Sequence, residues 1–240
     1  MRLSLKRAYL KAKDLFTKPN GNSFNGIFYA PADADHERVY LFQIPTEAEA
    51  KKSGRSGLRL MGGMGNEGEI KSFHILMREC LEEVIGDEAT QKFYAKGSIK
   101  HLNEDQKRVI RILETALQRF EEKMTGGSEP LTGIFTKTFW PDRANSKQDH
   151  WHKERNNIVS IEVSRGDLYH LADVAKQTAQ QEGNKEVKDI ALLGESELIT
   201  RLKAEKTMTY QNERIGLFRH LRSLVPQAMR GVPVLAPARP

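Results

Sequence analysis

The chain has 240 residues, with 38 Lys and Arg against 32 Asp and Glu, and a formal net charge of +6. This length fits one decorated domain or two small ones, and a hydrophobic content of 38% excludes disorder of the whole chain. No segment approaches the ~18 consecutive apolar residues that a bilayer span requires. The single cysteine, Cys80, excludes an internal disulfide framework. With no signal-peptide pattern either, these features favour a cytoplasmic protein.

The positive charge is concentrated at the two ends of the chain. Residues 1–18 carry six bases and one acid, residues 219–240 carry four arginines and no acid, and the part between them is mildly acidic. The first segment has the pattern of a basic amphipathic helix, which suits contact with RNA or a membrane surface, a transit peptide, or an ordinary solvated terminal element. We expect a basic N-terminal segment (1–18), one domain (19–225) and a flexible basic tail (226–240).

Strands and helices intermix along the chain. Short runs of aromatic and β-branched residues predict strands at 23–30, 38–44, 58–61, 131–140, 157–163 and 189–193, with a charged loop at 45–57. Apolar residues at helical spacing predict helices at 71–84, 103–124, 165–181, 195–206 and 209–224. Gly86 is a natural end for the first helix, and Asn103 suits the cap of the second. This order predicts an α/β or α+β fold.

Three glutamates on the helix at 71–84 carry the chemical signal. Glu79, Glu82 and Glu83 stand at i, i+3 and i+4, so their carboxylates share one helix face. Alone, this pattern is typical of a solvated surface. Here, however, it follows a short strand and a glycine-rich segment, 62–68, an arrangement typical of phosphate and metal sites. Clustered carboxylates suit Mg²⁺ or Mn²⁺, and Arg78 suits a contact that holds one carboxylate in place.

These residues resemble the box of the Nudix hydrolases, G-x5-E-x7-R-E-U-x-E-E-x-G-U, where U is a bulky apolar residue. Gly63 and Glu69 match its opening, and the run from Arg78 to Glu83 matches its catalytic part. Two departures exist: eight residues separate Glu69 from Arg78 where the family has seven, and Gly86 stands one position late. Both fall at the ends of the helix and leave the Arg-Glu-Glu-Glu set intact.

The resemblance implies a Nudix-like α/β/α sandwich with a mixed sheet, in which helix 103–124 is an insertion. It implies an Mg²⁺-dependent pyrophosphohydrolase that cleaves a nucleoside diphosphate linked to another moiety, such as ADP-ribose, a nucleotide sugar or a dinucleoside polyphosphate. Glu79 and Glu83 would be the main metal ligands, and the main-chain carbonyl of Gly62 would be a further ligand. Glu82 would bind a second ion or act through a metal-bound water. The resemblance makes Arg78 and Glu69 an orienting ion pair. By position, Glu182 and Glu186 are candidates for a general base.

Residues outside the box bear on substrate choice. Phe139, Trp140 and Trp151 flank a polar loop, where an aromatic ring either stacks on a nucleobase or packs in the core. His150 and His152 lack a third ligand at a recognisable spacing, so the loop is interpreted as polar rather than metal-binding. Helix 103–124 must bury its apolar stripe against the sandwich, a second subunit or the substrate as a lid. If the stripe is buried against a second subunit, the protein is an oligomer.

Two other functions stay open. The basic termini suit a hydrolase of RNA caps or RNA 5′ ends, whose affinity would fall steeply with salt. The altered ends of the box also suit a catalytically silent nucleotide-binding or regulatory module. A broad nucleotide panel with Mg²⁺ or Mn²⁺ separates these functions.

Overall fold

The computed structural model describes residues 21–53, 57–64, 72–125, 133–136, 154–181, 187–204 and 211–232. The strands are β1 (Gly21–Ala30), β2 (Val39–Pro45), β3 (Met61–Met64), β4 (Gly133–Thr136), β5 (Glu154–Glu162) and β6 (Val187–Gly194). The helices are α2 (Glu47–Ser53), α3 (Ser72–Ile85), α4 (Asp87–Lys96), α5 (Glu104–Thr125), α6 (Arg165–Ala179), α7 (Glu195–Lys203) and α8 (Gln211–Leu224).

The strands form one mixed sheet in the order β4-β5-β1-β2-β6. Its central pair, β1 and β5, is parallel, and the other pairings are antiparallel. β1 shares its other side between two strands: its last residues pair with β2, while residues 23–26 pair with β3. This sharing brings the glycine-containing strand β3 to the centre of the sheet.

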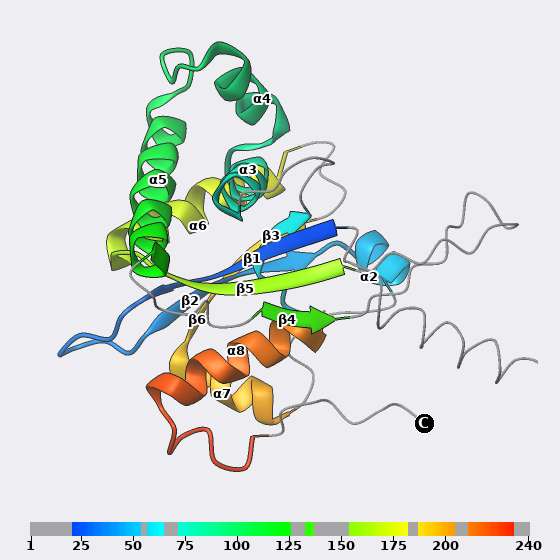
Figure 1. The fold of residues 1–240 in the computed structure, drawn as a ribbon, viewed down its shortest axis with the longest axis vertical. Coiled ribbons are helices and arrows are strands. Elements are labelled where there is room, and N and C mark those ends of the chain that lie inside the picture. The colour runs from blue at the N-terminus through cyan, green and yellow to red at the C-terminus, as the bar shows by residue number, and fades with distance from the viewer. Residues whose placement is uncertain are drawn as a thin grey trace, which may run out of the picture.

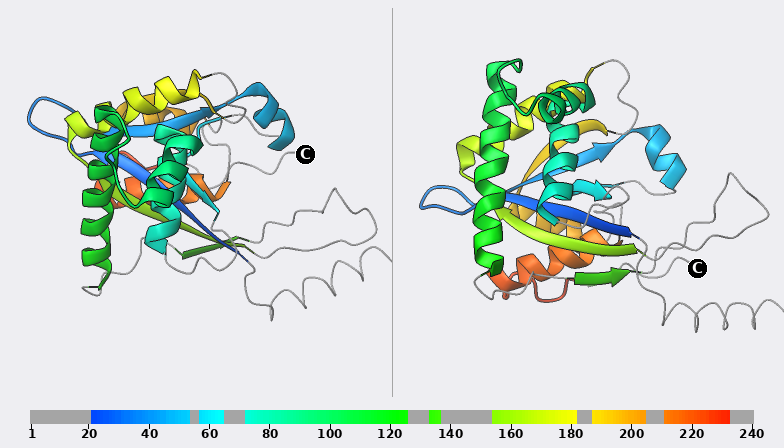
Figure 2. Two further views of the ribbon diagram at one scale, coloured as in Figure 1. Left: turned by 90° about the horizontal axis from the view of Figure 1, so that it is seen from above. Right: turned by 45° about the horizontal axis from the view of Figure 1, so that its top comes forward.

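Helices cover both faces of the sheet (Figures 1 and 2). Side chains alternate along each strand, so Phe28 and Leu41 face α3, α5 and α6, while Ile27 and Tyr40 face α7 and α8. Two hydrophobic clusters result, one on each side of the sheet. The expected mixed α/β class is confirmed, and the layers are helix, sheet and helix.

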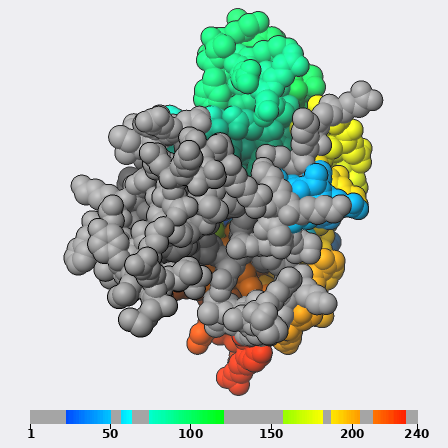
Figure 3. All heavy atoms as spheres, turned by 90° about the vertical axis from the view of Figure 1, so that its right-hand side faces the viewer, coloured from blue at the N-terminus to red at the C-terminus, as the bar shows by residue number. Residues whose placement is uncertain are grey.

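α5 packs against the sandwich, which answers one question that the sequence left open. Its stripe, which includes Val109, Leu113 and Leu117, is buried in the same cluster as α3 and α6. Asn103 and Gln106 cap its start reciprocally, because each side-chain oxygen accepts a hydrogen bond from the other residue's backbone N–H, at 2.8 and 3.2 Å. Figure 3 shows the region of α4 and α5 (green) at one end of the molecule, with the turn after α8 (red) at the other.

Two helices occur where none was expected. α2 lies in the segment predicted as a charged loop, and the Thr46 hydroxyl accepts a hydrogen bond from the Glu49 N–H at 3.2 Å at its start. Ala, Glu and Lys are strong helix formers, so this short helix forms without an apolar stripe. α4 follows Gly86 directly, and of its residues only Ala89 and Thr90 are buried, so hydrophobic periodicity did not reveal it. No helix of the described ranges is long and apolar enough to cross a membrane.

The start of the expected flexible tail is packed onto the fold. Residues 226–231 form turns, and Met229 and Val232 are 4% and 6% exposed in the cluster beneath α7 and α8. Backbone hydrogen bonds tie Met229 to Val225 and Val232 to Met229. The remaining residues, 233–240, lie outside the described ranges, as do residues 1–20.

Candidate functional site

The glycine pair at the centre of β3 forms the floor of the candidate site. Gly62 has a φ of +126°, and a Cβ atom there would lie 2.1 Å from the carbonyl oxygen of Phe24. Only glycine combines this backbone conformation with so close a neighbouring strand. The backbone of β3 is therefore accessible to side chains that approach from α3.

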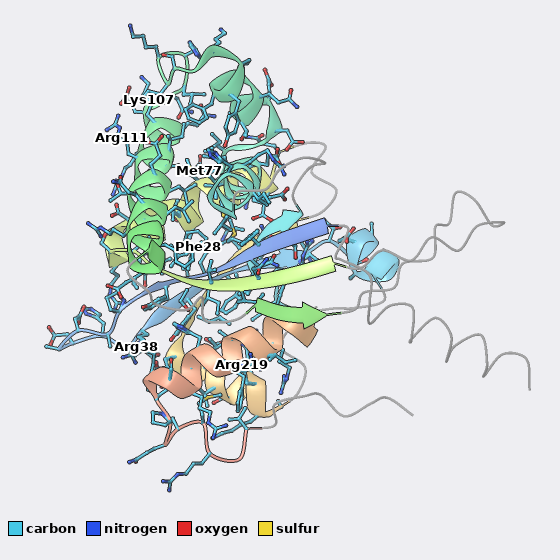
Figure 4. All side chains as sticks on the ribbon, viewed as in Figure 1. Phe28, Arg38, Met77, Lys107, Arg111 and Arg219 are labelled. Carbon is cyan, nitrogen blue, oxygen red and sulfur yellow. The ribbon has the colours of Figure 1, made fainter. Side chains whose placement is uncertain are left out.

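α3 lies across this floor with its apolar side against the sheet. Met77 of α3 and Phe28 of β1 are buried between the helix and the sheet (Figure 4). Cys80 and Val84 are buried in the same way, at 0% and 1% exposure. Arg78, Glu79, Glu82 and Glu83 stand at intermediate exposure, at the margin between core and solvent. The i, i+3, i+4 spacing thus places the three glutamates on one side of the helix, as the sequence indicates.

Two of these carboxylates lie against the glycine pair. The Gly62 N–H donates a hydrogen bond to Glu83 Oε2 at 2.8 Å. The Glu79 carboxylate fills the space beside Gly63, because a Cβ atom at Gly63 would lie 1.9 Å from Glu79 Oε2. Any larger residue at position 63 would displace the Glu79 carboxylate.

Arg78 contacts the carboxylates of Glu79 and Glu82. Its Nη2 lies 2.8 Å from Glu79 Oε1, and its Nη1 donates to both oxygens of Glu82 at 3.0 and 3.1 Å. The expected role of Arg78 as a holder of one carboxylate therefore extends to two. Glu69, the partner that the resemblance gives to Arg78, lies outside the described residues, so that pair stays a prediction.

Glu83 has the most perturbed environment of the three glutamates. Burial raises the pKa of its carboxyl to about 8, and nearby Glu79 adds to the rise. The Gly62 N–H, the Gln43 amide and the Arg59 guanidinium oppose the rise because they favour the charged form. A carboxylate held in this way, beside another carboxylate, is stabilised by any further cation that reaches it.

Gln43 and Arg59 are parts of the site that the sequence analysis missed. Their backbones exchange two hydrogen bonds of 2.9 Å, which joins the end of β2 to the segment before β3. Gln43 is 1% exposed, and it is the one polar residue in the apolar run of β2. That polar break in the apolar run is the signal that could have drawn attention to it.

A buried glutamate on α8 was also missed. Glu213 is 5% exposed, and its Oε2 accepts a hydrogen bond from the Leu60 N–H at 2.9 Å. Leu60 directly precedes β3, so α8 anchors the strand that carries the glycine pair. A buried carboxylate is rare without such a partner, and helical spacing alone did not distinguish it from a surface glutamate.

The remaining predicted site residues divide into two groups. Cys80 is buried as expected, and burial raises the pKa of its thiol well above the usual value, with Glu83 and Glu79 adding to the rise. The predicted aromatic contacts, the histidine loop and the candidate bases lie outside the described residues and stay predictions: Phe139, Trp140, Trp151, His150, His152, Glu182 and Glu186.

The described side chains do not converge on one point as a metal site. Among them, no group of three His, Cys, Asp or Glu residues is arranged to hold a metal ion. Glu79 and Glu82 instead contact Arg78, while Glu83 contacts Gly62. The available donors nevertheless fit Mg²⁺ or Mn²⁺. They are the carboxylate oxygens of Glu79, Glu82 and Glu83, and these two ions prefer oxygen ligands of this kind. No family model matches the chain, and no curated protein matches it at a significant level.

Proposed function

We propose that this protein is a divergent Nudix-type hydrolase, an Mg²⁺- or Mn²⁺-dependent pyrophosphohydrolase that cleaves a nucleoside diphosphate linked to another moiety. One observation carries the proposal: Glu79 and Glu83 of α3 lie against the adjacent glycines of β3. The helix, the strand before it and the layered mixed sheet fit the α/β/α sandwich that the resemblance implies.

The environment of Glu83 argues against a plain charged helix surface. On α4, Glu88 is an exposed glutamate whose pKa is lowered by a hydrogen bond to Lys92. Glu83 shows the opposite behaviour, since burial raises the pKa of its carboxyl to about 8. A protein gains nothing in stability from burying a carboxylate beside another one. Such an arrangement is typical of sites where function requires a perturbed group.

In this proposal, each box residue has a physical role. Glu79, Glu82 and Glu83 would hold the metal ions together with the carbonyl of Gly62. The bound ions would supply neutralisation of the pyrophosphate charge and a lowered pKa of bound water. Arg78 orients the Glu79 and Glu82 carboxylates from the same helix. Gln43 and Arg59 support Glu83 from the sheet, because both favour its charged form.

The test is a nucleotide panel with Mg²⁺ or Mn²⁺, with products identified by mass spectrometry. The panel includes ADP-ribose, nucleotide sugars, dinucleoside polyphosphates and capped RNA. We expect wild type to release a phosphate-containing product and Glu83→Gln to lose more than about 100-fold in rate, because a ligand charge is removed. Glu114→Gln, at an exposed position on α5, is the matched control and should keep full activity.

The other outcomes identify the alternatives. Hydrolysis of capped RNA alone, with an affinity that falls steeply with salt, would assign the protein to RNA 5′ ends. No product from any substrate, together with saturable nucleotide binding, would support a silent binding module. An active Glu83→Gln variant would contradict the proposed site.

A further inference from the structure

The exposed face of α8 carries arginines without acidic neighbours. Buried residues of α8, including Leu217 and Leu221, pack into the cluster beneath the sheet, and Gly216 lies against Ile158. This leaves Arg219 and Arg222 exposed one turn apart, so their Cβ atoms are about 5–6 Å from each other. The sequence from Arg214 to Val232 contains no Asp or Glu.

A third exposed arginine follows the helix in the chain. Arg230 is exposed on the turn after α8, and its backbone N–H donates to the Gln227 carbonyl at 3.2 Å. Because Met229 and Val232 on either side are buried, this turn is fixed to the α8 layer. The helix dipole explains a cation in the last turn of α8, but it does not explain Arg230, which lies outside the helix.

Two exposed arginines elsewhere, Arg108 and Arg201, have acidic partners. Arg108 pairs with Asp167 at 3.3 Å, and Arg201 pairs with Glu197 at 2.6 Å. Within the described ranges, no ion pair or side-chain hydrogen bond is seen for the three arginines that we call the α8 arginine face, which are Arg219, Arg222 and Arg230. Their guanidinium groups are thus available for phosphate, to which arginine presents a planar fork of donors.

We propose that the α8 arginine face is a docking surface for the phosphodiester backbone of a nucleic acid. The large hydrophobic side chains that the described residues expose, Tyr94 and Tyr169, lie on α4 and α6. The face therefore lacks the apolar anchors by which peripheral elements insert into a membrane interface. It also lies across the sheet from α3, so it is separate from the carboxylate site (Figure 1).

The test is fluorescence anisotropy of labelled 20-nucleotide single-stranded RNA and DNA over a range of salt concentrations. The variant R219A/R222A/R230A is compared with R108A/R111A/R119A, which removes three exposed arginines from α5. Figure 4 shows Arg219 and Arg111 on opposite sides of the sheet. Melting temperatures of both variants should stay near wild type, because exposed substitutions rarely change stability. The charge-conserving variant R219K/R222K/R230K should keep most of the binding.

We expect the α8 variant to bind more than about tenfold more weakly at 50 mM salt, and its log–log salt slope to fall by about 2, since each lost contact with a single strand contributes about 0.7. The α5 variant should bind nearly as wild type does. Comparing the RNA and DNA arms shows which backbone is preferred. Equal weakening by both variants, no effect of the α8 variant, or binding only to anionic vesicles or acidic peptides would overturn the proposal.

Discussion

Glu83 makes the stability of the metal-free protein depend on pH in an unusual direction. Its carboxyl has a pKa of about 8 in the folded state against 4.5 ordinarily, so the folded chain binds more protons than the unfolded chain between these values. The contribution of Glu83 to the free energy of unfolding is therefore most favourable below pH 4.5. It becomes less favourable as the pH rises toward 8. Glu83→Gln removes this dependence because the amide does not ionise.

The size of the effect follows from the two pKa values. At about 1.4 kcal/mol for each pH unit, the charged Glu83 disfavours folding by about 3 kcal/mol at pH 7 and by about 5 kcal/mol above pH 9. These are upper values, since the side chain keeps some contact with solvent. For a chain of this length, 3 kcal/mol corresponds to about 10 °C in melting temperature.

The assay is denaturant unfolding of wild type and Glu83→Gln in the presence of a chelator, from pH 5 to pH 9. The difference between the two proteins isolates the titration of Glu83 from that of other groups. We expect the variant to become progressively more stable than wild type as the pH rises, while Glu114→Gln on α5 shows no such trend. Adding Mg²⁺ should stabilise wild type and have little effect on Glu83→Gln. A difference that stays constant with pH would refute the assigned environment of Glu83.

Two further predictions concern Gly63 in the candidate site and His220 on α8. Gly63→Ala should abolish stabilisation by Mg²⁺ in thermal melts, because its Cβ would displace the Glu79 carboxylate, while Gly166→Ala, where a Cβ meets nothing within 4 Å, should behave as wild type. Burial, with Arg38 adding to the effect, lowers the pKa of His220 to about 4, so its stabilising contribution is lost as the pH falls from 6.5 to 4, by up to about 3 kcal/mol. Urea unfolding between pH 4 and 7 should show this loss in wild type and a flatter profile in His220→Gln, and equal profiles would contradict it.

Local sequence patterns predicted most of the elements. The helices α3, α5, α6, α7 and α8 overlap the helices expected from apolar spacing, because each buries one stripe against the sheet. α2 and α4 escaped detection because neither buries a wide apolar stripe, and the prediction depended on such a stripe. A helix that forms by capping and intrinsic propensity leaves little periodic signal.

The candidate site was predictable only in part. The spacing of Glu79, Glu82 and Glu83 places their carboxylates on one helix face, whatever the tertiary structure. Their partners come from other segments: Gln43 and Arg59 approach Glu83 from the sheet, and Glu213 fixes the backbone before the glycine pair. No local pattern gives contacts between residues that stand 153 positions apart, as Leu60 and Glu213 do.

The sequence by itself determined the mixed α/β class, the capped amphipathic helix α5 and the carboxylate cluster of α3, because periodicity and spacing depend on neighbours along the chain. The tertiary structure decided that β1 pairs with β5 in parallel, that α5 covers the sandwich, and that Glu83 is buried against Gly62. It also paired Arg108 of α5 with Asp167 of α6. The physical reason is that burial and ion pairing depend on which segments meet, and strand order decides which segments meet.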